Sequence, residues 1–241
     1  CEKGEGAVLV YVNPSEDEKR FLVRDLLLDE HTLNSALDPD ELSRLEFEPE
    51  HLAVIFKKPK NYSTEDEFLF KVNSMGLFLF RERLVIVIPD DIQLFNGKVF
   101  NNVRSLHDVL LKILYRTIFH YLDHLKAINL ISESLEQKIN ASLENKYLLN
   151  LFSLEKSLVY YLNAINSNAV VIDRIRNHAE RLALSTENRE LLDDISIENT
   201  QCYRQAEIYS NILASMMDAR VSIVSNNLNV LMKTLNIITI A

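Results

Sequence analysis

Glycine and proline are both absent from residues 98–241, because all four glycines and all five prolines of the chain lie before residue 98. β-Sandwiches, barrels and repeated βαβ folds need these two residues in their turns. Such folds are therefore excluded for the last three fifths of the chain. What remains compatible with this stretch is a small number of long helices.

Charge divides the chain at the same place. The whole net charge of −9 lies in residues 1–97, whereas residues 98–241 carry equal numbers of acidic and basic side chains. An acidic protein repels nucleic acid and anionic lipid surfaces, so we expect neither as a main partner. The two cysteines, Cys1 and Cys202, are too few for a disulfide framework or a zinc ligand set and favour a reducing compartment.

The sequence has no motif typical of an enzyme. It lacks the G-x-x-x-x-G-K-[ST] phosphate loop, the H-E-x-x-H zinc motif and the nucleophile elbow. It also lacks a signal peptide and any run of about 18 apolar residues. Residues 235–241 become steadily more apolar without a polar cap, so we expect the natural chain to continue beyond them.

Residues 1–100 are predicted to form a small α/β domain of the α+β type, with a mixed, mostly antiparallel sheet flanked by helices. Ser15 and Glu18 form a capping box that begins the first helix. The predicted strands are 7–12, 52–56, 68–72, 77–80 and 84–88, the helices are 16–28 and 31–45, and the turns are 73–76 and 81–83.

Three helical segments follow, at about 103–139, 143–184 and 190–241. We therefore divide the remainder into two long helices at 101–186, which pack on the α/β domain, and a stalk helix at 187–241. The helical segment at 190–241 alone spans roughly 78 Å at 1.5 Å per residue. It must project and find partners outside its own subunit.

The stalk helix carries two neighbouring seams with alternating spacings of three and four residues. The first, which we call the polar seam, is almost wholly small and polar. Its members are Asn211, Ser215, Asp218, Ser222, Ser225, Asn229, Met232, Asn236 and Thr239. The second, the apolar seam, consists of Ile212, Met216, Ala219, Ile223, Asn226, Val230, Lys233 and Ile237.

Two interpretations of these seams are open. In the first, the polar seam is an outer, solvated face and the apolar seam packs on the preceding helix. In the second, the apolar seam contacts neighbouring subunits in a ring, and the polar seam lines a wet central axis. Uncharged Asn and Thr oxygens there replace part of a cation's hydration shell without holding the ion tightly.

Residues 224–238, VSNNLNVLMKTLNII, resemble the end of the stalk helix and the start of the first transmembrane helix in CorA-type divalent-cation transporters. Residues 10–16, 31–45, 52–56, 74–79 and 84–87 resemble, in order, the strands and helices of the same family's cytosolic domain. The family's Gly-Met-Asn signature follows the first membrane helix and is not in this sequence.

The resemblance implies a homopentamer in which the stalk helices surround the ion path. Asn229 matches the family's asparagine at the cytosolic pore mouth, Met232 and Leu235 match its apolar constriction, and Asp218 matches an acidic ring. Ser222, Asn236 and Thr239 are expected to face the same axis.

The resemblance also implies a regulatory Mg²⁺ site between subunits. Asp194 matches its carboxylate near the start of the stalk helix. The position of the partner carboxylate is occupied by Leu37, with Asp38 adjacent and Asp40 nearby. Asp38 or Asp40 is then the candidate partner, and a helix N-cap is the alternative role for this Asp-Pro-Asp segment.

The function implied is the cytosolic regulatory and pore-entrance domain of a Mg²⁺ channel or transporter at the inner membrane, with Co²⁺, Ni²⁺ or Zn²⁺ as further candidate ions. The zinc-transporting branch of the superfamily and a soluble helical oligomerisation scaffold are the alternatives. His120 and His124, four residues apart on one helix, are either zinc ligands or hydrogen-bonded core histidines.

Overall fold

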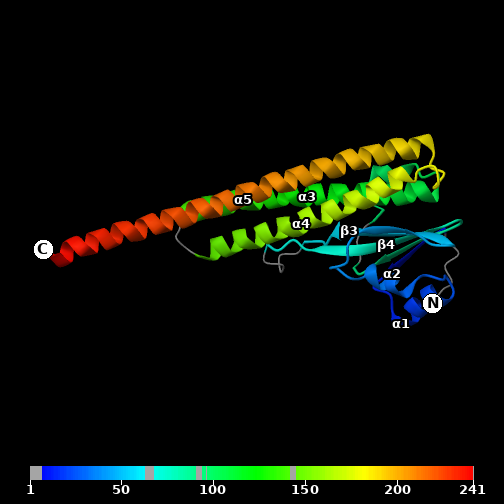
Figure 1. The fold of residues 1–241 in the computed structure, drawn as a ribbon, viewed down its shortest axis with the longest axis horizontal. Coiled ribbons are helices and arrows are strands. Elements are labelled where there is room, and N and C mark those ends of the chain that lie inside the picture. Colours follow the sequence, from blue (N-terminus) through cyan, green and yellow to red (C-terminus); the bar gives the residue numbers. More distant parts are fainter. Residues whose placement is uncertain (1–6, 63–67, 91–93, 96, 142–144, 241) are drawn as a thin grey trace.

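The computed structural model describes the chain except for residues 1–6, 63–67, 91–93, 96, 142–144 and 241. Beyond residue 220 it describes the backbone of the last helix as far as Ile240, with side chains at Ser222, Asn229, Met232 and Lys233. A five-stranded sheet and three long helices make up most of the molecule (Figure 1).

The sheet has the strand order β1-β5-β4-β3-β2. Its central strands pair antiparallel, and the first strand pairs parallel with the fifth, Val8 opposite Leu84. The predicted mixed, mostly antiparallel sheet is therefore confirmed. The strands are β1 (Val8–Val12), β2 (Arg44–Phe47), β3 (His51–Pro59), β4 (Val72–Phe80) and β5 (Leu84–Ile88).

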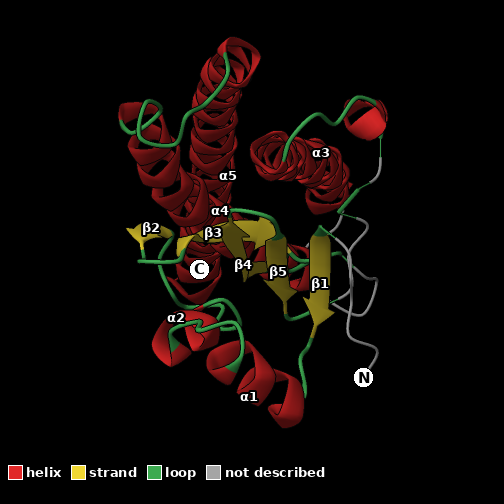
Figure 2. Cartoon of the chain, turned by 90° about the vertical axis from the view of Figure 1, so that its right-hand side faces the viewer, coloured by secondary structure: helices red, strands yellow, loops and turns green. Residues whose placement is uncertain are grey.

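Alternating apolar side chains give the sheet two buried faces. On β5, Leu84, Ile86 and Ile88 join one apolar cluster, whereas Val85 and Val87 join the other. Helices α1 (Glu16–Arg24) and α2 (Glu30–Ser35) cover the second face. Helices α3 (Leu106–Ala141) and α4 (Asn145–Asn177) cover the first face, so the sheet lies between two helical layers (Figure 2).

The stalk helix, α5 (Thr186–Ile240), packs on α3 and α4 on the side away from the sheet. Its buried positions repeat at spacings of three and four residues, as in a coiled coil. They are Asn188, Leu192, Ile195, Asn199, Cys202 and Ala206, and Leu213 follows seven residues later. The carboxyl-terminal part of α5 extends well beyond the ends of α3 and α4 (Figure 1), as the length of the helix predicted.

Three local predictions in the α/β region are wrong. The predicted turn at 73–76 lies inside β4, the predicted strand at 68–72 contributes only Val72, and the predicted helix at 31–45 ends at Ser35 and is followed by β2. Gly76 does not mark a turn. A Cβ at Gly76 would lie 2.6 Å from the Cβ of Ala36, so the glycine allows α2 to approach the strand closely.

Candidate functional site

The described part of the polar seam is exposed on α5. Asn211, Ser215, Asp218, Ser222 and Asn229 are all exposed. The Ser215 hydroxyl donates to the Asn211 carbonyl at 2.8 Å, and the Ser222 hydroxyl donates to the Asp218 carbonyl at 3.0 Å. These bonds satisfy the hydroxyl protons within the helix and leave oxygen lone pairs on the exposed face.

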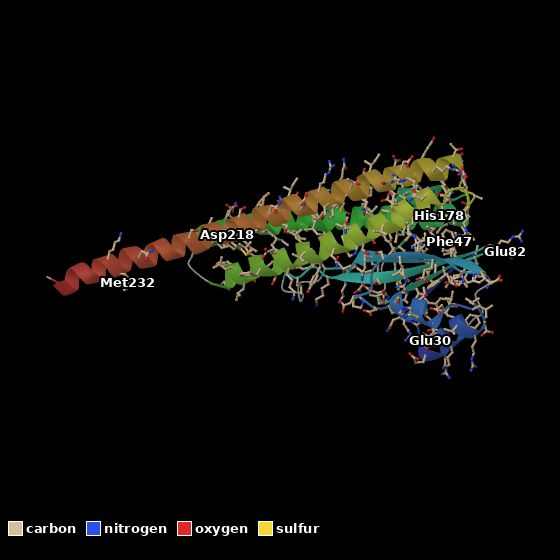
Figure 3. The ribbon with its side chains drawn as sticks, viewed as in Figure 1. Glu30, Phe47, Glu82, His178, Asp218 and Met232 are labelled. Atoms are coloured by element: carbon tan, nitrogen blue, oxygen red, sulfur yellow. The ribbon has the colours of Figure 1, made fainter. Side chains whose placement is uncertain are left out.

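The polar seam lies opposite the packing face of α5. At about 100° per residue, Asn211 and Asp218 are turned roughly 180° from Cys202, which is fully buried against α3 and α4. Asp218 and Met232 project from the helix in Figure 3, Met232 from the part beyond α3 and α4. The Met232 side chain is 57% exposed. Leu235, Asn236 and Thr239 are helical, but their side chains lie outside the described part.

Among the described residues, the apolar seam is only partly covered by its own chain, and Ile212, Met216 and Ala219 line a cavity together with Leu151 of α4. Ile212 is 45% exposed and Ala219 is exposed, whereas Met216 is partly buried against the core. This row of apolar side chains leaves surface available for a neighbouring molecule. Exposure of the polar seam is compatible with both interpretations, and the exposed apolar side chains leave room for the subunit contact that the second interpretation requires.

Asp194 is exposed near the beginning of α5. The carboxylates of Asp194 and Glu198 lie close enough to Tyr115 on α3 to help raise the pKa of its hydroxyl, after the larger effect of burial. Glu198 follows Asp194 by one helical turn, so both carboxylates are on one face. Sequence analysis missed Glu198, although the spacing of four residues was the available signal.

Asp38 and Asp40 are exposed in the loop between α2 and β2. The Asp40 N–H donates to Asp38 Oδ1 at 2.9 Å, which closes a turn. The helix-cap alternative is wrong, because no helix begins here and β2 starts at Arg44. Asp40 lies beside Tyr160 and Asn163 of α4, whereas Asp194 lies on α5 near Tyr115 of α3.

A buried lysine holds the Asp38–Asp40 loop, and sequence analysis missed it. Lys57 on β3 is 5% exposed, and its Nζ donates to the Pro39 carbonyl at 2.6 Å and to Ser74 Oγ at 3.0 Å. The Ser74 hydroxyl donates to the Asp38 carbonyl at 2.6 Å. Burial lowers the pKa of Lys57, and the charges of the nearby acidic side chains oppose this shift. A lysine within an apolar strand was the only sequence signal.

His120 and His124 contact each other edge to face, with ring centroids 4.5 Å apart. His124 Nδ1 is 2.6 Å from the Tyr161 hydroxyl, and its ring also contacts Phe70 at 5.3 Å. Within the described residues, no three His, Cys, Asp or Glu side chains gather closely enough to hold a metal ion. The geometry favours hydrogen-bonded core histidines.

Acid is expected to destabilise the fold through His124. Burial, and secondarily the charge of His120, lowers the pKa of His124 from 6.5 to about 3. Between pH 6.5 and about pH 3 the unfolded chain therefore binds one more proton than the folded chain. The stability that comes from keeping His124 neutral is present above pH 6.5 and is lost as pH falls. Between pH 7 and pH 5 the free energy of unfolding should fall by about 2 kcal/mol because of His124.

Urea denaturation of the His124→Gln variant measures this effect. We expect a flatter dependence of the free energy of unfolding on pH than in the unaltered protein, with exposed His31→Gln as the matched control. An unchanged pH slope in His124→Gln would show that His124 is not the group that titrates.

The described residues contain no helical stretch long and apolar enough to cross a membrane. The family model for the CorA-like Mg²⁺ transporter protein matches residues 9–241. The cobalt/magnesium transport protein CorA of Methanocaldococcus jannaschii is 24% identical over 238 residues, which cover 94% of this chain and 73% of that protein.

Solved structures show the same fold. The complete CorA magnesium transporter of M. jannaschii has a TM-score of 0.82 at 22% identity, over 96% of this chain and 74% of that one. Its soluble domain has a TM-score of 0.78 at 21% identity, over 89% and 87% of the two chains. The ZntB cytoplasmic domain of Vibrio parahaemolyticus has a TM-score of 0.70 at 14% identity, over 92% and 91%.

Proposed function

The chain belongs to the CorA-like Mg²⁺ transporter family, and on this premise we propose that it forms the cytosolic regulatory and pore-entrance part of a homopentameric divalent-cation channel. The natural protein would continue from α5 into membrane-spanning segments and place this domain on the cytosolic face of the inner membrane. The function proposed is conduction, not catalysis of a reaction.

The observation that carries the proposal is the orientation of the polar seam. A helix that packs on its own subunit through one face and exposes a polar seam with a single charged member, Asp218, on the opposite face suits the inner ring of a funnel. Five such helices would bring Ser222 and Asn229 around a shared axis. Neutral oxygens there would replace part of the hydration shell of an ion without trapping it.

Charge and apolarity along the seam suggest two further roles. A ring of Asp218 carboxylates above the pore would raise the local concentration of cations. Met232, exposed beyond α3 and α4, would form with Leu235 an apolar constriction that closes by excluding water. Asn236 and Thr239 would continue the polar lining toward the membrane.

Regulation by Mg²⁺ would use carboxylates from two subunits. Asp40 lies beside α4, whereas Asp194 lies near Tyr115 of α3, so a shared site would use carboxylates of neighbouring copies. Mg²⁺ accepts one or two carboxylates and keeps several waters, so one aspartate from each side is chemically sufficient. Bound ions would hold neighbouring subunits together in the closed state.

The identity of the conducted ion needs a flux measurement. We propose Mg²⁺, with Co²⁺ and Ni²⁺ as further substrates. A likeness in fold to both CorA and ZntB does not discriminate Mg²⁺ from Zn²⁺. Uptake of each ion into vesicles containing the natural protein, at matched free concentrations, separates the two branches.

A cysteine at Asn229 tests the ring arrangement. In the natural protein in vesicles, Asn229→Cys on a background without Cys1 and Cys202 is expected to cross-link between subunits under mild oxidation. In a separate sample kept reduced, a small, positively charged thiol reagent should reduce Mg²⁺ flux at least tenfold, because the modified side chains would narrow a shared path.

Leu130→Cys is the matched control, because this α3 side chain is 66% exposed and lies outside the polar seam. It should react with the reagent without cross-linking through the axis and without loss of flux. Failure of the Asn229→Cys protein to cross-link, together with unchanged flux after modification, would place Asn229 away from the axis and contradict the proposal.

A further inference from the structure

A cavity of about 400 Å³ lies where α3 and α5 begin, at the same end of the molecule (Figure 1). Its walls come from the loop before α3 and from the first turns of both helices, between Asn102 and Lys112 and between Ser185 and Leu191. Neither the polar seam nor Asp194 is among the described residues that line it. The volume lies within the range of small-ligand sites.

Asn188 on α5 brings an unused amide to this cavity. The residue lines the cavity and is 7% exposed. Its backbone N–H donates to Ser185 Oγ at 3.2 Å, but its side-chain amide has no hydrogen-bond partner among the residues that the structure describes. Buried polar groups in folded proteins are almost always paired, so an amide left over at a cavity indicates that a bound molecule completes its bonds.

The N-termini of two long helices meet at the same cavity. Ser105 Oγ accepts from the Asp108 N–H at 3.1 Å at the start of α3, and Ser185 Oγ caps α5 in the same way through Asn188. Both serines line the cavity. Each helix N-terminus is equivalent to roughly half a positive charge, and its first N–H groups favour an anion.

The charged side chains around the cavity balance one another. Lys112 Nζ donates to Asp108 Oδ2 at 3.1 Å and also to the Asn102 carbonyl, and both charged residues are 8% exposed. Arg104 Nη1 donates to Glu187 Oε1 at 3.4 Å. Two cations and two carboxylates therefore cancel among the described lining residues, so the two helix N-termini leave a positive charge of roughly one.

This residual charge and the available donors suit a single carboxylate. The Arg104 side chain is 77% exposed, and apart from its bond to Glu187 its guanidinium has no partner among the described residues. A guanidinium offers flat, paired N–H donors that match the two oxygens of a carboxylate, and the Asn188 NH₂ group is a further donor. Leu191 gives the wall an apolar side chain for a short hydrocarbon part.

We propose that this cavity binds the carboxylate of a small organic acid that carries one negative charge. The Asn188 amide is the buried donor, and the Arg104 guanidinium is the second contact. The bound carboxylate joins the first turn of α5 to the loop before α3, so it holds the beginning of the stalk helix against its neighbour.

NMR titration of the ¹⁵N-labelled 241-residue protein with sodium acetate tests the proposal. We expect saturable shifts of the Asn188 side-chain amide and of the backbone N–H groups of Thr186 and Glu187. Acetamide has nearly the same shape without the charge and should give no saturable shift. Sodium chloride at the same concentrations controls for ionic strength and should also give none.

Asn188→Ala should weaken acetate binding at least tenfold, as followed on the backbone signals of Thr186 and Glu187. Its melting temperature without acetate should equal that of the unaltered protein, because the amide has no partner to lose. Acetate should raise the melting temperature of the unaltered protein but not that of Asn188→Ala. Arg104→Gln changes an exposed side chain and should also weaken binding, which gives a second measurement independent of the buried position.

Asn177→Ala is the matched control, because Asn177 is exposed at the end of α4 and lies outside the cavity. It should bind acetate as the unaltered protein does. Absence of saturable shifts with acetate would mean that water alone satisfies the Asn188 amide, and it overturns the proposal. Equal binding of acetamide or chloride, or unchanged acetate affinity in both Asn188→Ala and Arg104→Gln, overturns it as well.

Discussion

Replacing Asn168 by alanine is expected to lower the free energy of unfolding by about 3–5 kcal/mol. Asn168 lies on α4 and is fully buried. Its Oδ1 accepts from the Lys57 backbone N–H at 2.8 Å and from the Ser43 hydroxyl at 2.7 Å, and its Nδ2 donates to the Lys57 carbonyl at 2.9 Å. One amide therefore joins α4 to two segments of the α/β region.

The size of this effect follows from the groups that alanine leaves behind. The N–H and carbonyl of Lys57 and the Ser43 hydroxyl would each lose a partner in a buried place, at about 1–3 kcal/mol for each group. For a chain of this length the melting temperature should fall by about 10 °C. Urea denaturation and differential scanning calorimetry measure both quantities.

Asn163→Ala is the matched control, because Asn163 lies on the same helix and is exposed. Its substitution should change the free energy of unfolding by less than about 0.5 kcal/mol. In the Asn168→Ala/Ser43→Ala double variant part of the loss should be recovered, because the orphaned hydroxyl is gone. A loss below about 1 kcal/mol in Asn168→Ala would mean that water satisfies these groups.

The long helices were predictable because local signals determine them. The absence of glycine and proline over residues 98–241 and the spacing of apolar residues predicted both ends of α3 and α5, and the start of α4, to within four residues. The predicted end of α4, residue 184, is seven residues too late, because α4 ends at Asn177. The strand at 84–88 was also placed correctly, because it is a short apolar run between turn residues. The capping box of Ser15 and Glu18 marked the beginning of α1 correctly.

The errors arise where tertiary contacts override local signals. Residues 73–76 contain asparagine, serine and glycine, which favour a turn, but pairing with β3 and close contact with Ala36 keep them in a strand. The helix predicted at 31–45 stops at Ser35, because Pro39 clashes with a preceding helical turn and disfavours helical backbone at the residue before it. Lys57 and Ser74 then bind carbonyls of the loop that follows. No local pattern in residues 31–45 records bonds made by a lysine on another strand.

Part of the candidate site, the polar seam, could be predicted from local sequence spacing, whereas a site shared between subunits could not. A heptad spacing identifies the polar seam from sequence, and the structure then shows that it lies opposite the packing face. A site shared between subunits depends on how copies assemble, and one chain carries no signal for that. Glu198, Lys57 and Asn168 acquired their importance only from partners on other elements.

Substitution of Asp194 is expected to remove most of the Mg²⁺-dependent closure of the natural protein. One weak site at ten times its dissociation constant stabilises the closed state by roughly 1.4 kcal/mol. Five sites together contribute about 7 kcal/mol, which exceeds the roughly 5.5 kcal/mol needed to change a 1:99 equilibrium into 99:1. Five weak sites can therefore act as a switch near millimolar Mg²⁺, whereas one site cannot.

Limited proteolysis of α5 in the natural protein, with and without Mg²⁺, measures this closure. In the unaltered protein Mg²⁺ should slow cleavage strongly, and in Asp194→Asn and Asp194→Lys cleavage should become nearly independent of Mg²⁺. The fold should persist in both variants, because Asp194 is exposed and neither its burial nor its bonding supports the core.

Asp193→Asn provides the matched control, because Asp193 is also exposed and is turned about 100° away on the same helix. Mg²⁺ should protect α5 from proteolysis in Asp193→Asn as well as it does in the unaltered protein. Neutralising Asp38 and Asp40 together should reproduce the effect of Asp194→Asn. Unchanged protection in the Asp194 variants would leave Asp194 as a surface carboxylate near the start of α5. The Mg²⁺-sensing residues would then have to be sought elsewhere, first at Glu198, because it shares the face of Asp194 toward Tyr115.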